Sequence, residues 1–175
     1  MKGMEKNVGD LKCLVLRMKK KLVSSIFLGV VVCLSVGFLA GKATQTSVNN
    51  WYLSLDKPFL NPPNWLFAPV WTTLYLLMGI AVGRVWFLGV HQRGIKTAIY
   101  HFGFQLFFNG LWSIVFFGLK NPIGAMMLIL ILLILIVRTI HSFGTIDLLA
   151  KRLLYPYLIW VTFATYLNAG IVFLN

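Results

Sequence analysis

The stretch from Leu22 to Gly41 is twenty residues long and carries no charged side chain. As an α-helix rising ~1.5 Å per residue it would span ~30 Å, the thickness of a bilayer's hydrocarbon core. With 59% hydrophobic and 11% charged residues, the chain has too little polar surface for a soluble domain. The sequence therefore predicts an all-α integral membrane protein, a five-transmembrane-helix bundle over residues 22–175. The predicted helices cover about residues 22–41, 68–89, 96–119, 123–143 and 151–174.

A secretory signal peptide would also place a basic leader before an apolar stretch. The apolar core of a signal peptide has about 7–15 residues and a small-residue cleavage site directly after it. The stretch in this chain is longer, and small residues occupy every fourth position within it. They are Ser25, Gly29, Cys33, Gly37 and Gly41. Because residues at this spacing share one helix face and let another helix approach closely, we expect a retained membrane helix.

The basic residues are distributed as in a membrane protein. The net charge is +12, from 16 Lys and Arg against 4 Asp and Glu. Thirteen basic residues lie in the leader (residues 1–21) or around the connections that follow the second and fourth helices. Lys42, Lys57 and Lys120 lie on the other side. The positive-inside rule then places the amino terminus in the cytoplasm. Nucleic acid is not expected as a partner, because basic and aromatic residues do not interleave on a polar face.

The segment of residues 42–67 interrupts the apolar pattern. Its prolines, Pro62 and Pro63 among them, exclude a regular helix. It also contains several aromatic rings, including those of Trp51 and Tyr52. A connection this long and this rich in rings is expected to fold onto the bundle as a lid.

Three predicted helices each carry rings, amides and small residues on one face. These sets are Trp71, Tyr75 and Gly79; Gln105, Asn109 and Trp112; and Trp160, Ala164 and Asn168. Side chains at this spacing share one side of a helix, and polar side chains in a bilayer face other helices. The three faces would then line a pocket for a flat apolar ligand beneath the lid. Helix packing and the interfacial aromatic belt account for the same residues without a ligand, so both interpretations stay open.

A second face of the third helix carries glycines spaced by seven and eight, namely Gly103, Gly110 and Gly118. Small residues allow close packing of helices, so we predict a homodimer through this face.

The sequence contains no pattern typical of a metal site. His91, His101 and His141 lie in different segments, and the two cysteines, Cys13 and Cys33, lack metal-ligand spacing. No metal ion and no obligatory cofactor are expected.

Three motifs make the chain similar to a known family. They are Trp51-Tyr52-(x)4-Lys57-Pro58 with Pro62-Pro63-Asn64-Trp65-(x)3-Pro69-Val70-Trp71, then Gln105-(x)3-Asn109-(x)2-Trp112-Ser113, and finally Pro156-Tyr157-(x)2-Trp160-(x)2-Phe163-Ala164-(x)2-Leu167-Asn168. In these motifs the chain resembles the TspO/MBR family, which comprises translocator proteins (peripheral benzodiazepine receptors) and bacterial tryptophan-rich sensory proteins. The resemblance covers about residues 22–175.

This resemblance implies a five-helix bundle, often dimeric, with a pocket capped by the first loop. It also implies binding of porphyrins such as protoporphyrin IX or a haem-like ligand. Trp71 and Trp160 match tryptophans linked with porphyrin binding and with its light-dependent breakdown. Asn109 and Ala164 match pocket positions, and Tyr52, Pro62 and Pro63 match the lid.

We therefore expect a porphyrin-binding membrane protein that senses or handles its ligand in a bacterial inner membrane, with lipid and porphyrin as partners. The alternatives are a transporter of porphyrin or other apolar molecules, and a light-dependent porphyrin-degrading enzyme with Trp71 and Trp160 as its only catalytic candidates. Cholesterol is disfavoured, because Tyr166 is not followed by the basic residue that animal members carry.

Overall fold

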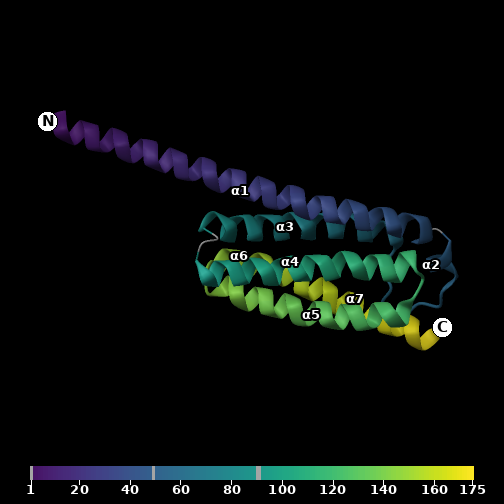
Figure 1. Cartoon of the computed structure of the whole chain (residues 1–175). Coiled ribbons are helices and arrows are strands. Elements are labelled where there is room, and N and C mark those ends of the chain that lie inside the picture. Colours follow the sequence, from purple (N-terminus) through teal and green to yellow (C-terminus); the bar gives the residue numbers. More distant parts are fainter. Residues whose placement is uncertain (1, 49, 90–91) are drawn as a thin grey trace.

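The structure, a computed structural model, describes residues 2–48, 50–89 and 92–175, with side chains from Lys12 onward except those of Ala43, Thr46, Val48 and Arg93. Every regular element in this part of the chain is a helix. Five helices are long: α1 (Lys2–Val48), α3 (Phe67–Phe87), α4 (Arg93–Ser113), α5 (Pro122–Gly144) and α7 (Tyr155–Leu174). The short elements are α2 (Trp51–Ser54), the 3-10 turn η1 (Asn64–Leu66), the π-helix η2 (Ile114–Gly118) and α6 (Leu148–Leu153). The long helices lie side by side, and the beginning of α1 extends beyond the bundle (Figure 1).

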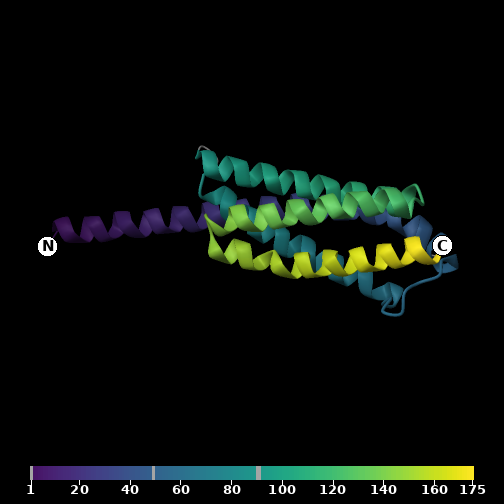
Figure 2. The same ribbon diagram turned by 90° about the horizontal axis from the view of Figure 1, so that it is seen from below.

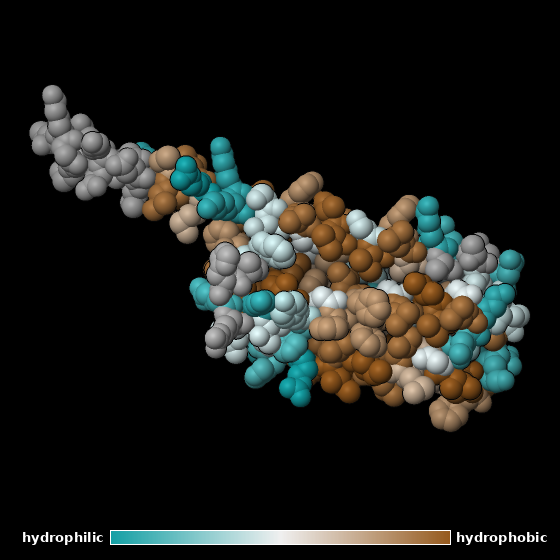
Figure 3. Space-filling view, in the orientation of Figure 1, coloured by the Kyte–Doolittle hydropathy of each residue, from teal (hydrophilic) through white to brown (hydrophobic). Residues whose placement is uncertain are grey.

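Four helical segments of the described chain are long and apolar enough to cross a membrane. They are Lys12–Lys42, Asn64–Phe87, Pro122–Gly144 and Leu148–Leu174. Figure 3 shows apolar side chains over the middle of the visible face of the bundle and hydrophilic ones towards its two ends. The chain is thus an all-helical integral membrane protein. Helix α4 does not belong to this group, because it carries the charged Lys96 as well as the polar residues His101, Gln105 and Asn109, which together lower its hydropathy.

Helix α1 is longer than the predicted first helix of residues 22–41. It begins at Lys2, within the basic leader of residues 1–21, and ends at Val48. The connection to α3 therefore starts after Val48 and not at residue 42. The first proline of the chain is Pro58, so no residue before it forces the helix to end.

Glycines bring the backbones of α1 and α3 into direct contact. A Cβ atom on Gly79 would lie 2.4 Å from the Val30 Cα, and one on Gly83 would lie 2.4 Å from the Ile26 Cα. A Cβ on Gly29 would lie 2.4 Å from the carbonyl oxygen of Gly79. Side chains larger than hydrogen cannot occupy these positions without moving the helices apart, and close approach of this kind is how membrane helices associate.

Gly79→Ala should lower the melting temperature of the protein in mild detergent, because the new methyl group overlaps backbone atoms of α1. Overpacking of this kind costs about 1–3 kcal/mol. The matched control is Gly103→Ala, since a Cβ on Gly103 would have no atom within 4 Å. If both variants melt together with the wild type, the contact between α1 and α3 is looser than described.

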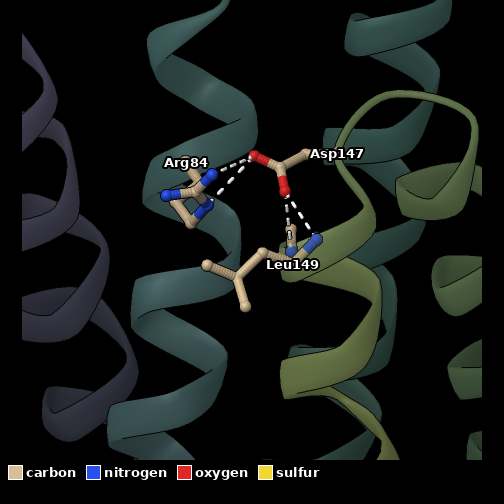
Figure 4. A network of polar contacts seen from close by, with 4 residues as sticks. Arg84, Asp147 and Leu149 are labelled. Carbon is tan, nitrogen blue, oxygen red and sulfur yellow. Dashed lines mark hydrogen bonds and ion pairs between the residues drawn. The ribbon is translucent and has the colours of Figure 1, made fainter.

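An ion pair joins α3 to the short helix α6 at the end of the bundle opposite the first loop. The Nη2 atom of Arg84 lies 2.7 Å from Oδ2 of Asp147, and Arg84 Nε donates to the same oxygen at 3.0 Å. The other carboxylate oxygen of Asp147 accepts the backbone N–H groups of Leu149 and Ala150 at 2.8 and 3.0 Å and so caps α6 (Figure 4). Burial alone would raise the pKa of Asp147, but the Ala150 N–H and the Arg84 guanidinium hold that pKa below its ordinary value.

Because the pKa of Asp147 is lower in the folded protein, its contribution to stability is present above the ordinary aspartate pKa of about 3.9 and disappears as the pH falls through the folded pKa. Asp147→Asn should therefore destabilise the protein by about 1 kcal/mol at pH 7, and the difference from wild type should shrink below pH ~4. Thermal unfolding as a function of pH tests this, with the exposed Asp56→Asn as control. Parallel pH curves for Asp147→Asn and wild type would contradict it.

Candidate functional site

The loop between α1 and α3 is folded onto the bundle. Tyr52 is 3% exposed, and its ring lies against those of Phe116 and Phe117, with centroids 6.4 and 5.8 Å away. Its hydroxyl donates to Oδ1 of Asn61 at 2.7 Å. Burial raises the pKa of Tyr52 to about 12, so the hydroxyl stays protonated and donates at neutral pH.

Two contacts also fasten this loop to the end of α7. The side-chain amide of Asn175 accepts the backbone N–H of Asp56 and donates to its carbonyl oxygen, both at 3.0 Å. Pro58 lies so close to Gly170 that a Cβ there would be 2.7 Å from the proline ring. The loop and α7 therefore hold one another in place.

The π-helix η2 places two rings beneath the loop. The predicted third helix ran to residue 119 as a regular helix, but its last turn, Ile114–Gly118, is wound with five-residue spacing. The rings of Phe116 and Phe117 lie 4.7 Å apart in an edge-to-face arrangement, and both line the cavity described next. Such π turns within α-helices are frequent at functional sites.

A cavity of about 570 Å³ lies beneath the loop, between α1, α3, α4 with η2, and α7. Pockets for small molecules have volumes of about 300–1,000 Å³ and mostly apolar walls with a few polar groups. The lining residues that the sequence predicted are Tyr52, Trp71, Tyr75, Asn109, Trp112, Trp160, Ala164 and Asn168. Helices far apart in the sequence thus contribute to one cavity of the size that ligands occupy.

Asn109 connects three helices at the deep end of this cavity. Its Oδ1 accepts a hydrogen bond from the Tyr75 hydroxyl of α3, and its Nδ2 donates to the Tyr157 hydroxyl of α7 at 3.0 Å. Asn109 and Tyr157 are almost fully buried. Because Tyr75 and Asn109 line the cavity and Tyr157 does not, this trio forms its floor.

Trp112 and Trp71 give the wall flat surfaces. The Trp71 ring lies 6.3 Å from that of Trp112 at a tilt of 31°, and the Trp112 ring is stacked on Phe116 at 5.5 Å. Trp112 Nε1 donates to Oδ1 of Asn168 at 3.2 Å, and Asn168 Nδ2 donates to the Pro122 carbonyl at 2.8 Å. The Trp112 ring is thus fixed in orientation by the hydrogen bond at its polar edge.

Three of the predicted site residues do not line the cavity. Gln105 lies one helical turn below Asn109, where the trio of Tyr75, Asn109 and Tyr157 separates it from the open space. Pro62 and Pro63 lead the loop into η1, where the Pro63 carbonyl accepts the Leu66 N–H at 3.0 Å, and neither proline is part of the cavity wall.

Helix α1 also contributes to the cavity wall, which was not predicted from the sequence. Gly37, Gly41 and Thr44 line the cavity, and Thr44 Oγ1 lies 2.9 Å from Ser113 Oγ of α4. The pattern of small residues at every fourth position pointed to a close helix contact, which Gly29 and Gly37 make. The same pattern did not indicate that its last residue, Gly41, would line the cavity.

Two buried polar side chains make no hydrogen bond to the described residues. Both amide atoms of Gln105 and the indole Nε1 of Trp160 are inaccessible and without a partner there. The Trp160 ring lines the cavity, so its N–H is a donor beside the site. Buried donors of this kind favour an acceptor wherever one is within reach.

The predicted dimer face is divided between two environments. Gly110 faces α1, with a Cβ position 3.4 Å from Val36 Cγ1, whereas Gly103 and Gly118 are exposed. The homodimer stays a prediction.

Among the residues with described positions, no group of three metal-ligating side chains occurs, and His91 lies outside the described residues.

Comparison with known proteins agrees with this architecture. Residues 29–174 match the sequence profile of the TspO/MBR family. The chain belongs to this family.

Relatives within the TspO/MBR family span three kinds of organism. The tryptophan-rich protein TspO of Chlorobaculum tepidum is 39% identical over 155 residues, covering 89% of this chain and 98% of that protein. The protein of the same name from Archaeoglobus fulgidus is 42% identical over 161 residues, covering 89% and 97%. The translocator protein of Homo sapiens is 34% identical over 133 residues, covering 75% and 78%.

Asn109→Leu should destabilise the TspO/MBR fold in this chain, because it leaves two buried tyrosine hydroxyls without their partner. An unpaired buried polar group costs about 1–3 kcal/mol. The matched control is Gln45→Leu, which replaces an exposed amide of the cavity wall. In thermal unfolding, adding Tyr157→Phe to Asn109→Leu should cost less than Tyr157→Phe alone. Strictly additive losses would show that the trio is not coupled.

Proposed function

We propose that this protein binds porphyrin-type molecules in the cavity beneath the loop, with protoporphyrin IX as the model ligand, and thereby senses or handles them. The observation that carries the proposal is the cavity itself, about 570 Å³ between walls of flat rings from Trp71, Trp112, Phe116 and Trp160. A planar macrocycle gains most from such walls, because aromatic rings stack in offset or edge-to-face arrangements.

The polar groups of the wall support a ligand with acceptor atoms. Most amides and hydroxyls there are already paired within the protein, including those of Tyr75, Asn109 and Asn168. The Trp160 ring lines the cavity, and its buried indole N–H has no partner among the described residues. A porphyrin presents ring nitrogens and carboxylates that accept hydrogen bonds.

The family relatives support a role in sensing or moving such a ligand. One relative, from Cereibacter sphaeroides, is called a tryptophan-rich sensory protein, and the mammalian relatives are called translocator proteins. We therefore propose a ligand site in this chain, and experiments must decide between sensing and transport of the ligand.

We further propose that α4 is a fifth membrane span. Its polar side chains bond inward: His101 Nδ1 lies 2.8 Å from Ser142 Oγ of α5, and Asn109 bonds Tyr75 and Tyr157. Its outward side chains are large and apolar, with Phe104 and Phe107 about as exposed as the lipid-facing residues of the other spans. A helix that hides its polar groups in the bundle meets the requirement for crossing a bilayer.

We propose the bacterial inner membrane as the protein's location, and the distribution of basic residues supports an orientation with the amino terminus in the cytoplasm. In this orientation the loop end of the bundle and the cavity lie on the outer side.

Binding of protoporphyrin IX is measured by quenching of tryptophan fluorescence in detergent-solubilised protein. The double substitution Trp71→Phe with Trp160→Phe should weaken the affinity about tenfold, because two indole rings of the wall are replaced by smaller phenyl rings. It should also slow light-driven loss of the porphyrin. Trp86→Phe is the matched control, since Trp86 is exposed and does not line the cavity. Wild-type affinity in the double variant would reject this site.

A further inference from the structure

The face along which α3 touches α1 is not covered over its whole length. Ala68 and Thr72 lie on the same face of α3 as Gly79 and Gly83, at positions i, i+4, i+11 and i+15. At the two glycines the α1 backbone is in contact. At Ala68 and Thr72 the same face is exposed, and both residues line the cavity. Helix α1 has therefore moved away from α3 at this end.

The facing side of α1 shows the same change. A Cβ on Gly29 would overlap the α3 backbone, and one on Gly37 would lie 2.5 Å from the Tyr75 ring, whereas one on Gly41 would have no atom within 4 Å. Phe38 and Gln45, on either side of Gly41, are exposed and also line the cavity. In Figure 2 the end of α1 and the start of α3 diverge towards the loop end of the bundle.

Residues that are both exposed and part of the wall mark the place where a cavity opens. Here they come from α1 and α3, so the opening faces sideways from the bundle. The loop above is fastened to α7 through Asp56, Pro58 and Asn175. A ligand that entered sideways would leave these fastenings intact.

The opening lies at the polar boundary of the bilayer. The apolar span of α1 ends at Lys42, and the span that contains α3 begins at Asn64. Amphiphilic molecules settle at this depth, with flat apolar bodies among the acyl chains and charged groups towards water.

The side chain of Lys42 lies beside the opening. Lys42 Nζ lies 4.9 Å above the ring of Phe38, a residue of the opening. The ammonium of Lys57 is instead directed to the carbonyl oxygens of Leu53 and Leu55, at 3.3 and 2.9 Å. An ammonium on a flexible stem at the membrane interface attracts anionic groups.

We propose that carboxylate-bearing amphiphiles enter the cavity sideways from the bilayer, between α1 and α3, and that Lys42 selects them by pairing with the carboxylate at the opening. This inference rests on the proposed porphyrin site and adds to it a route of access and a residue that determines specificity. It concerns rates of binding, which separates it from the affinity set by the cavity walls.

The first experiment follows transfer of protoporphyrin IX from preloaded vesicles to nanodisc-embedded protein by stopped-flow tryptophan quenching. Lys42→Gln should lower the association rate about fivefold, as one interfacial cation is worth about that factor. The dimethyl ester of protoporphyrin IX should be taken up equally by both proteins, because it lacks the charge. Lys120→Gln is the matched control, as it removes a cation of the same side in the turn before α5. If Lys42→Gln lowers the association rates of the diacid and the ester equally, or lowers neither, the proposed role of Lys42 is overturned.

The second experiment narrows the opening. Gly41→Trp should slow both association and dissociation of protoporphyrin IX about tenfold, because a barrier on the route acts on both rates. Thr72→Trp, on the opposite side of the opening, should act in the same direction if the first variant folds poorly. Gly94→Trp is the control, since a Cβ on Gly94 also has no atom within 4 Å and lies outside the cavity wall.

The outcomes separate the two proposals. Normal affinity with wild-type rates in Gly41→Trp and Thr72→Trp leaves the porphyrin site standing and overturns the sideways route. Absence of any quenching in the wild type overturns the porphyrin site and this inference together.

Discussion

A single buried amide organises the middle of this membrane protein. Asn109 of α4 accepts from Tyr75 of α3 and donates to Tyr157 of α7, so three helices meet at one side chain. In a bilayer, a polar group that lacks a partner costs more than any one packing contact gains, and the helices must therefore keep this arrangement. The trio also sets the depth of the cavity. Below it Gln105 is sealed in the bundle, and above it Trp71, Trp112 and Trp160 surround open space.

The relation of α1 to α3 differs at its two ends, and both ends matter for the site. At Gly29, Gly79 and Gly83 the backbones touch, which fixes the helices where the bundle is tightest. Towards Gly41 they separate, and the space between them joins the cavity. The loop that roofs the cavity is fastened to the end of α7 by the hydrogen bonds between Asp56 and Asn175. One wall can thus be open to the bilayer while the roof stays in place.

Much of this structure follows from patterns that the sequence carries locally. Matched stripes on three helices predicted which rings and amides face one another, because helical periodicity and the cost of polar groups in lipid together leave one orientation. Three features of the structure could not be predicted from the sequence. The π turn at Ile114–Gly118 depends on how Phe116 and Phe117 pack beneath Tyr52, which is a tertiary effect. The exclusion of Gln105 depends on a hydrogen-bonded floor. The role of α1 in the wall depends on where α1 separates from α3. The pattern of small residues along α1 is the same before and after that point, so it does not predict the separation.

The hydrogen bonds within the cavity wall affect which ligands the cavity could distinguish. Tyr75, Asn109, Trp112 and Asn168 are already engaged with one another or with the Pro122 carbonyl. A ligand consequently meets a wall whose hydrogen-bonding groups are mostly paired already. Its shape and thickness, rather than its polar groups, would then determine whether it binds. Sites of this type tolerate compounds with unrelated functional groups, since nothing inside rejects a flat molecule for lacking a particular donor. For the proposed site we therefore expect binding of planar compounds that differ in their functional groups.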